Sequence, residues 1–162
     1  MVVLILVTLG TQDKQFTRLL DSVEKAIEEG YIKDKVIVQA GFTKYESKNM
    51  EIFDSMDRDK FSSFMNEADL IITHGGVGTI MTALQERKKI LAAARLAQYH
   101  EHVNDHQIQL LSSFDEQGYL IYMRDLSDIT PYIKKVQEFE PKMYKSNQEY
   151  FVSEIKNWID SH

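Results

Sequence analysis

The sequence predicts a single α/β domain in which a mostly parallel sheet carries helices on both faces. Short apolar runs alternate along the chain with longer segments whose apolar residues recur every three or four positions. Strands that alternate with helices favour a parallel sheet, because each return to a neighbouring strand needs a helical crossover. The chain contains no internal repeat and no linker rich in proline or glycine, so we expect one domain over residues 1–162.

The strands are predicted from runs of aliphatic residues. The first, at residues 2–7, is continuously apolar, which is typical of a central parallel strand covered on both faces. Further strands are expected at Lys35–Gln39, at Glu51–Phe53 and over residues 70–73, 90–94 and 119–123. Apolar residues at helical spacing predict helices over residues 16–27, 61–65, 80–84, 102–114 and 129–136, and a C-terminal helix at about 143–160.

Composition excludes several classes of partner. Lys and Arg total 19 against 25 Asp and Glu, and a net charge of −6 disfavours binding to nucleic acid or to an anionic membrane surface. The chain has no cysteine, so it has neither disulfides nor thiolate metal sites, as expected in the cytoplasm. No apolar run reaches the roughly 20 residues that span a bilayer, so any work at a membrane needs another protein as anchor.

Three polar segments follow predicted strands, where ligands of parallel sheets bind. In the first, residues 8–13, one glycine and two threonines can offer N–H groups and hydroxyls to an anion. Thr11 or Asp13 could instead cap the following helix. The segment alone does not decide between the two interpretations.

The second segment, residues 74–79, reads His-Gly-Gly-Val-Gly-Thr. Its glycines let the backbone approach a ligand closely, and the next helix points its positive end at the same place. A tight turn alone would need fewer glycines, so an anion site is the favoured interpretation. The pattern is neither a Walker loop nor a dinucleotide fingerprint.

The third segment, residues 98–107, is almost entirely polar. Its side chains could bind ribose hydroxyls, phosphate or sugar, and those we single out are Glu101, His102, Asn104, His106 and Gln107. A solvated start of a helix is the alternative, because capping residues gather there.

The histidines of this segment raise the question of a metal. His102 and His106 would share one face of the predicted helix, and with His100 and His74 they could bind zinc. However, there is no His-Glu-x-x-His pattern, no cysteine and no clear carboxylate ligand. We therefore expect no metal site.

The three segments together resemble a known family. Thr-Leu-Gly-Thr-Gln (8–12), Thr-His-Gly-Gly-Val-Gly-Thr-Ile (73–80) and Glu-His-Val-Asn-Asp-His-Gln (101–107) are similar to the donor-binding, C-terminal half of GT-B glycosyltransferases of the family 28 type. The likeness is to the stand-alone version of that half, the soluble subunit of two-part UDP-sugar transferases. These include the UDP-N-acetylglucosamine transferase of the dolichol pathway and bacterial enzymes of capsule and exopolysaccharide assembly. It extends from residue 1 to about residue 123.

The resemblance implies roles by position. The phosphates would be cradled by His74, Gly75, Gly76, Val77, Gly78 and Thr79. Ribose or sugar would contact Glu101, His102, Asn104, His106 and Gln107, while Gly10 and Thr11 line the cleft. Arg95 could face the diphosphate. Many relatives carry a Glu at the position of Thr82, and many have Val-Pro-Arg where this chain has Ala93-Ala94-Arg95.

The function implied is transfer of a sugar from a UDP-sugar to a lipid-linked saccharide, with inversion, in exopolysaccharide or capsule biosynthesis. A membrane-anchored partner would bring the acceptor and recruit this cytoplasmic chain to the inner face of the membrane. The UDP-sugar is the donor substrate, and no cofactor is expected. The catalytic base is expected on the partner, with His102 or His106 as the fallback. A non-catalytic nucleotide-binding or regulatory module and a His-dependent metal hydrolase are the alternatives.

The C-terminal helix carries one apolar stripe, made of Phe151, Val152, Ile155, Trp158 and Ile159, with Tyr144 at its start. Such a stripe usually packs on the chain's own sheet. Docking of the membrane subunit is the other interpretation.

Overall fold

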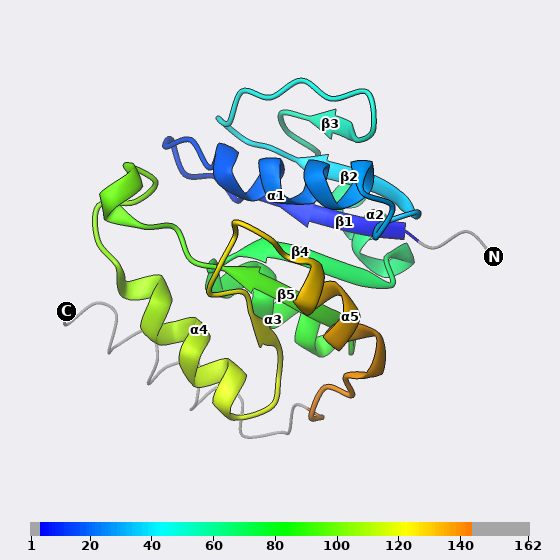
Figure 1. Cartoon of the computed structure of the whole chain (residues 1–162), viewed down its shortest axis with the longest axis vertical. Helices are drawn as coiled ribbons and strands as arrows, with labels where there is room; N and C mark the ends of the chain where they lie inside the picture. The colour runs from blue at the N-terminus through cyan, green and yellow to red at the C-terminus, as the bar shows by residue number, and fades with distance from the viewer. Residues whose placement is uncertain (1–3, 144–162) are drawn as a thin grey trace.

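A computed structural model of the chain describes residues 4–143, and it contains one sheet whose strands are all parallel (Figure 1). The order across the sheet is β3-β2-β1-β4-β5-β6. The strands are β1 (Leu4–Thr8), β2 (Lys35–Gln39), β3 (Glu51–Phe53), β4 (Leu70–His74), β5 (Lys89–Ala93) and β6 (Ile121–Tyr122). The predicted α/β fold is confirmed, and the sheet is entirely rather than mostly parallel.

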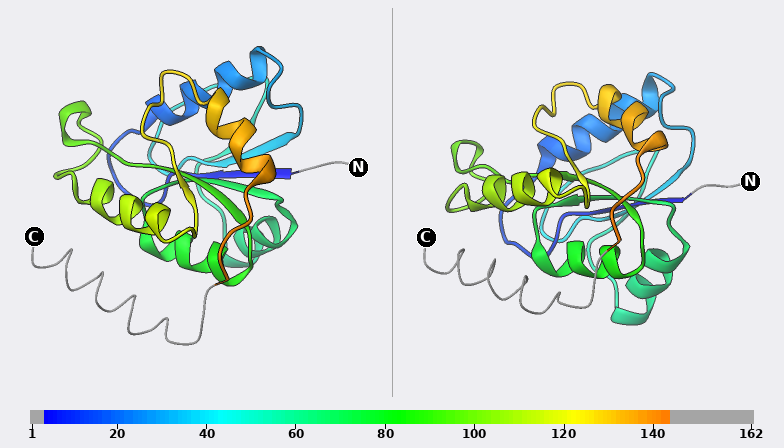
Figure 2. Two further views of the ribbon diagram at one scale, coloured as in Figure 1. Left: turned by 60° about the horizontal axis from the view of Figure 1, so that its bottom comes forward. Right: turned by 90° about the horizontal axis from the view of Figure 1, so that it is seen from below.

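Helices cover both faces of the sheet, as Figure 2 shows. α1 (Thr17–Glu28) and α5 (Thr130–Glu138) lie on one face. α2 (Arg58–Glu67), α3 (Val77–Gln85) and α4 (His106–Glu116) lie on the other. In β1, Ile5 and Val7 pack under the first pair while Leu4 and Leu6 pack under the second group. Burial on both faces is why this strand is apolar at every position.

The order of the strands fixes where loops diverge. β1 pairs with β2 on one side and with β4 on the other, so the direction of winding reverses between β1 and β4. Thr8 is paired with Thr73, and His74 with Ala93, so β1, β4 and β5 end at the same level. The loops after these strands therefore meet at the carboxyl edge, beside the topological switch point where ligands of open α/β sheets bind.

One predicted helix start was wrong, and so was one set of predicted capping residues. The helix expected over residues 102–114 begins at His106, after a loop that contains a short 3-10 helix, η1 (Ala97–Tyr99). Asp105 Oδ1 accepts a hydrogen bond from the N–H of Ala97 at 2.8 Å, and this bond holds the loop folded back before the helix. His102 consequently lies outside α4, and it does not share a helical face with His106.

The first helix also begins later than its capping residues suggested. α1 starts at Thr17 with Phe16 as its N-cap, so neither Thr11 nor Asp13 caps it. The Phe16 N–H instead donates to Thr43 Oγ1 at 3.0 Å. The interpretation of residues 8–13 as ordinary capping residues is therefore wrong.

Some expectations fall on residues that the structure does not describe. Residues 2–3 of the first predicted strand and nearly all of the helix predicted at 143–160, with its apolar stripe, lie outside residues 4–143. Among the described helices, none has the length and apolarity needed to cross a membrane.

Candidate functional site

Three loops at the carboxyl edge, after β1, β4 and β5, form the candidate site. Every residue predicted to bind the donor lies in these loops, at the end of β4 or in the first turns of α3 and α4, from Gly10 to Gln107. The three loops are held together by side chains that the sequence places far apart. The predicted residues consequently do gather in one region, although several of them face the protein rather than solvent.

Arg95 connects the first loop to the third. Its side chain is 1% exposed, and its guanidinium donates to the backbone carbonyl oxygens of Leu9, Lys14 and Glu101. Burial lowers its pKa to about 10, which leaves it protonated at neutral pH. The contact of Arg95 with the diphosphate stays a prediction: in this structure its two terminal nitrogens donate to backbone carbonyls that fix the loops, while its Nε is buried without a partner in residues 4–143.

Glu101 is buried as well, and it connects the third loop to α1. Its carboxylate accepts two hydrogen bonds from Arg18, at 2.9 and 3.0 Å, and one from the N–H of Leu96 at 3.0 Å. Charge-assisted, bidentate pairs of this kind are the strong ones. The contact of Glu101 with ribose or sugar stays a prediction, and in this structure the carboxylate is bound by Arg18 and by the N–H of Leu96.

Gln107 joins the second loop to the third. Its Oε1 accepts from the N–H of Gly75 at 3.1 Å and from the N–H of Arg95 at 2.9 Å. A Cβ on Gly75 would lie 2.9 Å from Gln107 Cβ and Oε1, so glycine is needed for this approach. The amide oxygen of Gln107 therefore sets the distance between the glycine loop (residues 74–79) and the loop after β5.

His74 is buried between two glycines. A Cβ on Gly10 would lie 2.2 Å from its Nε2, and a Cβ on Gly76 would lie 2.6 Å from its ring. Gly10 has φ +75°, which also favours glycine. Burial first, and then the charge of Arg95, lower the pKa of His74 to about 3, so the ring is neutral. Its Nδ1 is buried without a hydrogen-bond partner within residues 4–143.

The three glycines in residues 74–79 are therefore glycine for different structural reasons. Gly75 and Gly76 make room for the Gln107 and His74 side chains. Gly78 is exposed, and a Cβ there would meet nothing within 4 Å. It lies in the first turn of α3, whose N-cap is Gly76 and which no side chain caps. The N–H groups of Val77, Gly78 and Thr79 are the ones that a helix start leaves without intrahelical partners, and together they offer positive potential to an anion.

The remaining predicted residues border this helix start in the third loop. His102 is half-buried, and its Nε2 lies 3.1 Å from Gln12 Nε2 of the first loop. Burial first, and then Arg95, lower its pKa. Asn104 Oδ1 accepts from the N–H of His106 at 3.0 Å and so caps the start of α4. Thr11 is exposed in the first loop.

Two residues of this network were given no role by the sequence, although Gln12 belongs to the first polar segment. Arg18 pairs with a residue 83 positions later, and Gln12 contacts one 90 positions later. Both lie in or before α1 among other polar residues, and no local pattern distinguishes them.

In residues 4–143, no group of three or more His, Cys, Asp or Glu side chains is arranged to hold a metal ion.

An all-parallel sheet with helices on both faces and polar loops that meet at the switch point define a Rossmann-like domain, with the uncapped start of α3 in its candidate site. Residues 4–161 match the family model of the glycosyltransferase family 28 C-terminal domain. The chain therefore belongs to this family. No curated protein was found to match it.

Solved structures share the fold. The glycosyltransferase of kitacinnamycin superposes with a TM-score of 0.62 at 20% identity, over 86% of this chain and 35% of that one. MurG from Acinetobacter baumannii gives 0.58 at 15% identity, over 85% and 40%. The solution structure of ALG13 gives 0.57 at 18% identity and covers 90% of both chains. The chain thus has the architecture of half a GT-B fold and spans about a third of the length of the first of these enzymes.

Proposed function

We propose that this chain is the donor-binding subunit of an inverting glycosyltransferase that uses a UDP-sugar. The observation that carries the proposal is the uncapped start of α3 at the carboxyl edge, where Gly78 leaves the first turn open to a ligand. A helix N-terminus of this kind suits a diphosphate, because unpaired N–H groups and the helix dipole both favour negative charge. Membership of the glycosyltransferase family supports sugar transfer as the class of reaction.

Within this proposal, the residues divide into those that touch the donor and those that fix the loops. The N–H groups of Val77, Gly78 and Thr79 bind the diphosphate and stabilise the charge of the leaving UDP. Asn104 and His106, at the border of the same opening, contact ribose or sugar. Arg95, Glu101 and Gln107 Oε1 keep the three loops at fixed distances, so that the site is formed before the donor arrives.

The catalytic base belongs, in this proposal, to a partner subunit. His74 and His102 are poor candidates by their environment, because the pKa of His74 is about 3 and burial lowers that of His102, which leaves His106 as the fallback on this chain. A neutral imidazole with a lowered pKa accepts a proton less readily than a free one. The partner would be membrane-anchored, bring a lipid-linked saccharide from exopolysaccharide or capsule assembly and recruit this chain to the cytoplasmic face.

Calorimetric titration of the full chain with UDP and with ADP, each with and without EDTA, tests the proposal. We expect UDP to bind more tightly than ADP, and EDTA to leave the affinity unchanged, because peptide N–H groups rather than a metal hold the phosphates. Equal affinity for both nucleotides would favour a generic nucleotide-binding module. Loss of UDP binding with EDTA would contradict the metal-free site.

A further inference from the structure

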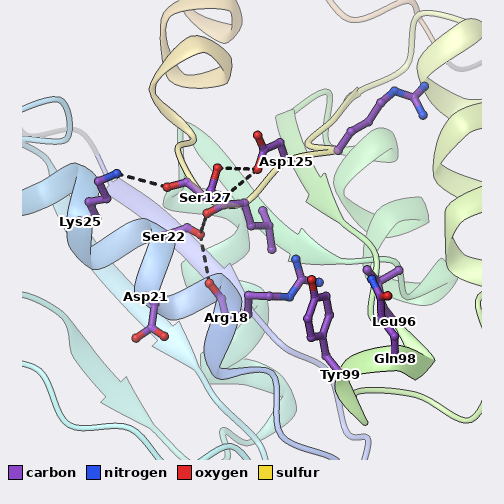
Figure 3. A pocket seen from close by; sticks show the side chains of 11 residues that line it. Arg18, Asp21, Ser22, Lys25, Leu96, Gln98, Tyr99, Asp125 and Ser127 are labelled. Carbon is purple, nitrogen blue, oxygen red and sulfur yellow. Dashed lines mark hydrogen bonds between the residues drawn. The ribbon is translucent and has the colours of Figure 1, made fainter.

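A pocket separate from the candidate donor site lies at the same edge of the sheet, on the face that carries α1 and α5. It has a volume of about 460 Å³ and lies between α1, η1 and the connection from β6 to α5. Figure 3 shows its walls, with Arg18, Ser22 and Lys25 on one side and Gln98 and Tyr99 on another. A volume of several hundred Å³ is in the range of small-molecule sites.

An exposed aromatic ring stands in the lining of this pocket. The side chain of Tyr99 is 53% exposed, although it belongs to a short 3-10 helix. The Arg18 guanidinium lies 4.6 Å from the centre of the ring, and the two side chains stand side by side in Figure 3. Stacking on a cation holds the ring in place. The result is a ring that Arg18 holds on one face and that is still more than half exposed at the pocket.

The polar groups around this ring have balanced charges. The lining contains the cations Arg18, Lys25 and Arg124 and the carboxylates Asp21 and Asp125. Arg18 is already neutralised by Glu101, and the Lys25 ammonium donates to the Ser127 carbonyl at 3.2 Å. With Glu101 included, three cations face three carboxylates, so an anionic ligand would find no net positive charge. A neutral ligand with many hydroxyls would find both donors and acceptors, namely the Gln98 amide, the carboxylates and the Lys25 ammonium.

The pocket and the candidate donor site share one loop, and an ion pair also connects them. η1 and Glu101 belong to the same loop, between β5 and α4, which borders the donor site on its other side. Arg18 lines the pocket and binds the Glu101 carboxylate, and Arg95 binds the Glu101 carbonyl oxygen at 3.1 Å. A molecule in this pocket therefore contacts the loop that also frames the donor.

We propose that this pocket binds a neutral saccharide unit of the acceptor, with a sugar ring lying on Tyr99. A pyranose has an apolar C–H face that suits an aromatic ring and a rim of hydroxyls that suits the amide and carboxylates. This inference rests on the proposed function, because a glycosyltransferase acceptor supplies the saccharide. It assigns to the donor-binding chain a part in holding the acceptor as well.

The test is an NMR titration of the full ¹⁵N-labelled chain with maltose, cellobiose and chitobiose at millimolar concentrations. We expect at least one disaccharide to shift the backbone amides of residues 96–101 and 124–127. Tyr99→Ala should abolish these shifts, and Tyr99→Phe should keep them because the ring remains. Tyr31→Ala is the matched control, since Tyr31 is 43% exposed but lies between α1 and β2, away from the carboxyl edge.

A UDP titration of the same samples separates this inference from the proposed function. If UDP binds but no disaccharide shifts these amides, or if the shifts survive Tyr99→Ala, the pocket is not a saccharide site and the donor site stands. If the disaccharide shifts appear in the absence of UDP binding, the pocket assignment holds and the donor assignment fails. Tyr99→Ala should leave UDP affinity within twofold of wild type, which also shows that the variant is folded.

Discussion

The imidazole of His74 fills the space between Gly10 and Gly76, and both of these residues lack a side chain because of it. The ring is neutral in the folded protein, since burial opposes its protonation. At the residue scale, the glycine loop is thus shaped by the packing of two buried side chains, His74 and Gln107. Only Gly78 is left with open space that the protein does not use.

The neutral His74 makes stability depend on pH. Its pKa is about 3 when folded and near 6.5 when unfolded, so below pH 6.5 the unfolded chain binds a proton that the folded chain does not. Protonation then favours unfolding, and the free energy of unfolding should fall by about 1 kcal/mol between pH 6 and pH 5 from this group alone. Urea unfolding across this range measures it. His74→Gln should show a shallower fall than wild type, and an equally steep fall would mean that His74 is protonated in the folded state.

Arg95 is expected to act on stability through its three carbonyl partners. Arg95→Met would leave the carbonyl oxygens of Leu9, Lys14 and Glu101 without this donor, and buried polar groups that lose a charged partner cost about 3 kcal/mol or more. Urea unfolding should show this loss. The control is Arg58→Met, because Arg58 is exposed at the start of α2 and should change stability by less than about 0.5 kcal/mol. Similar small effects in both variants would contradict the loop-fixing role.

At the scale of elements, the loop between β5 and α4 was the segment whose structure was hardest to predict from the sequence. In the sequence, the polar residues from Glu101 to Gln107 cannot be sorted into those that face a ligand and those that cap a helix. Burial separates them: Glu101 and Gln107 are buried and bind the protein, whereas Asn104 and His106 are partly exposed. Burial depends on which distant residues pack there, and Arg18 is one of those.

The strands and the location of the site were predictable because they follow from periodicity and topology. Lys35–Gln39 and Glu51–Phe53 appear with the expected bounds, and the loops after β1, β4 and β5 meet at one edge as parallel pairing requires. The start of α4 was not predictable, because the Asp105–Ala97 bond that delays it is a feature of the folded loop. The role of Arg95 was missed for a similar reason.

The ion pair between α1 and this loop should be visible as an energetic coupling. Arg18 and Glu101 form a bidentate pair in which the carboxylate is almost fully buried, so removing one partner leaves the other unsatisfied. In a double-mutant cycle with Arg18→Met and Glu101→Gln, we expect a coupling free energy of about 1–3 kcal/mol. Additive effects of the two substitutions would show that the pair does not connect these elements.

At the scale of the whole molecule, residues 4–143 form one half of a GT-B architecture with its functional loops on a single edge. The glycine loop and the uncapped start of α3 are there, and the pocket beside Tyr99 opens at the same edge on the opposite side of the β5–α4 loop. In the proposed function, a partner facing that edge brings the acceptor and the base. The proposed function requires that the start of α3 bind the donor's diphosphate.

The most direct test of that claim is the UDP affinity of Gly78→Asp compared with Gly78→Asn. Both side chains have nearly the same size and enter space that is open, and a negative charge in the first turn of a helix is favourable for folding. We predict that Gly78→Asp is at least as stable as Gly78→Asn but binds UDP at least tenfold more weakly, because its carboxylate repels the diphosphate. Equal UDP affinity in the two variants would place the diphosphate elsewhere and contradict the account.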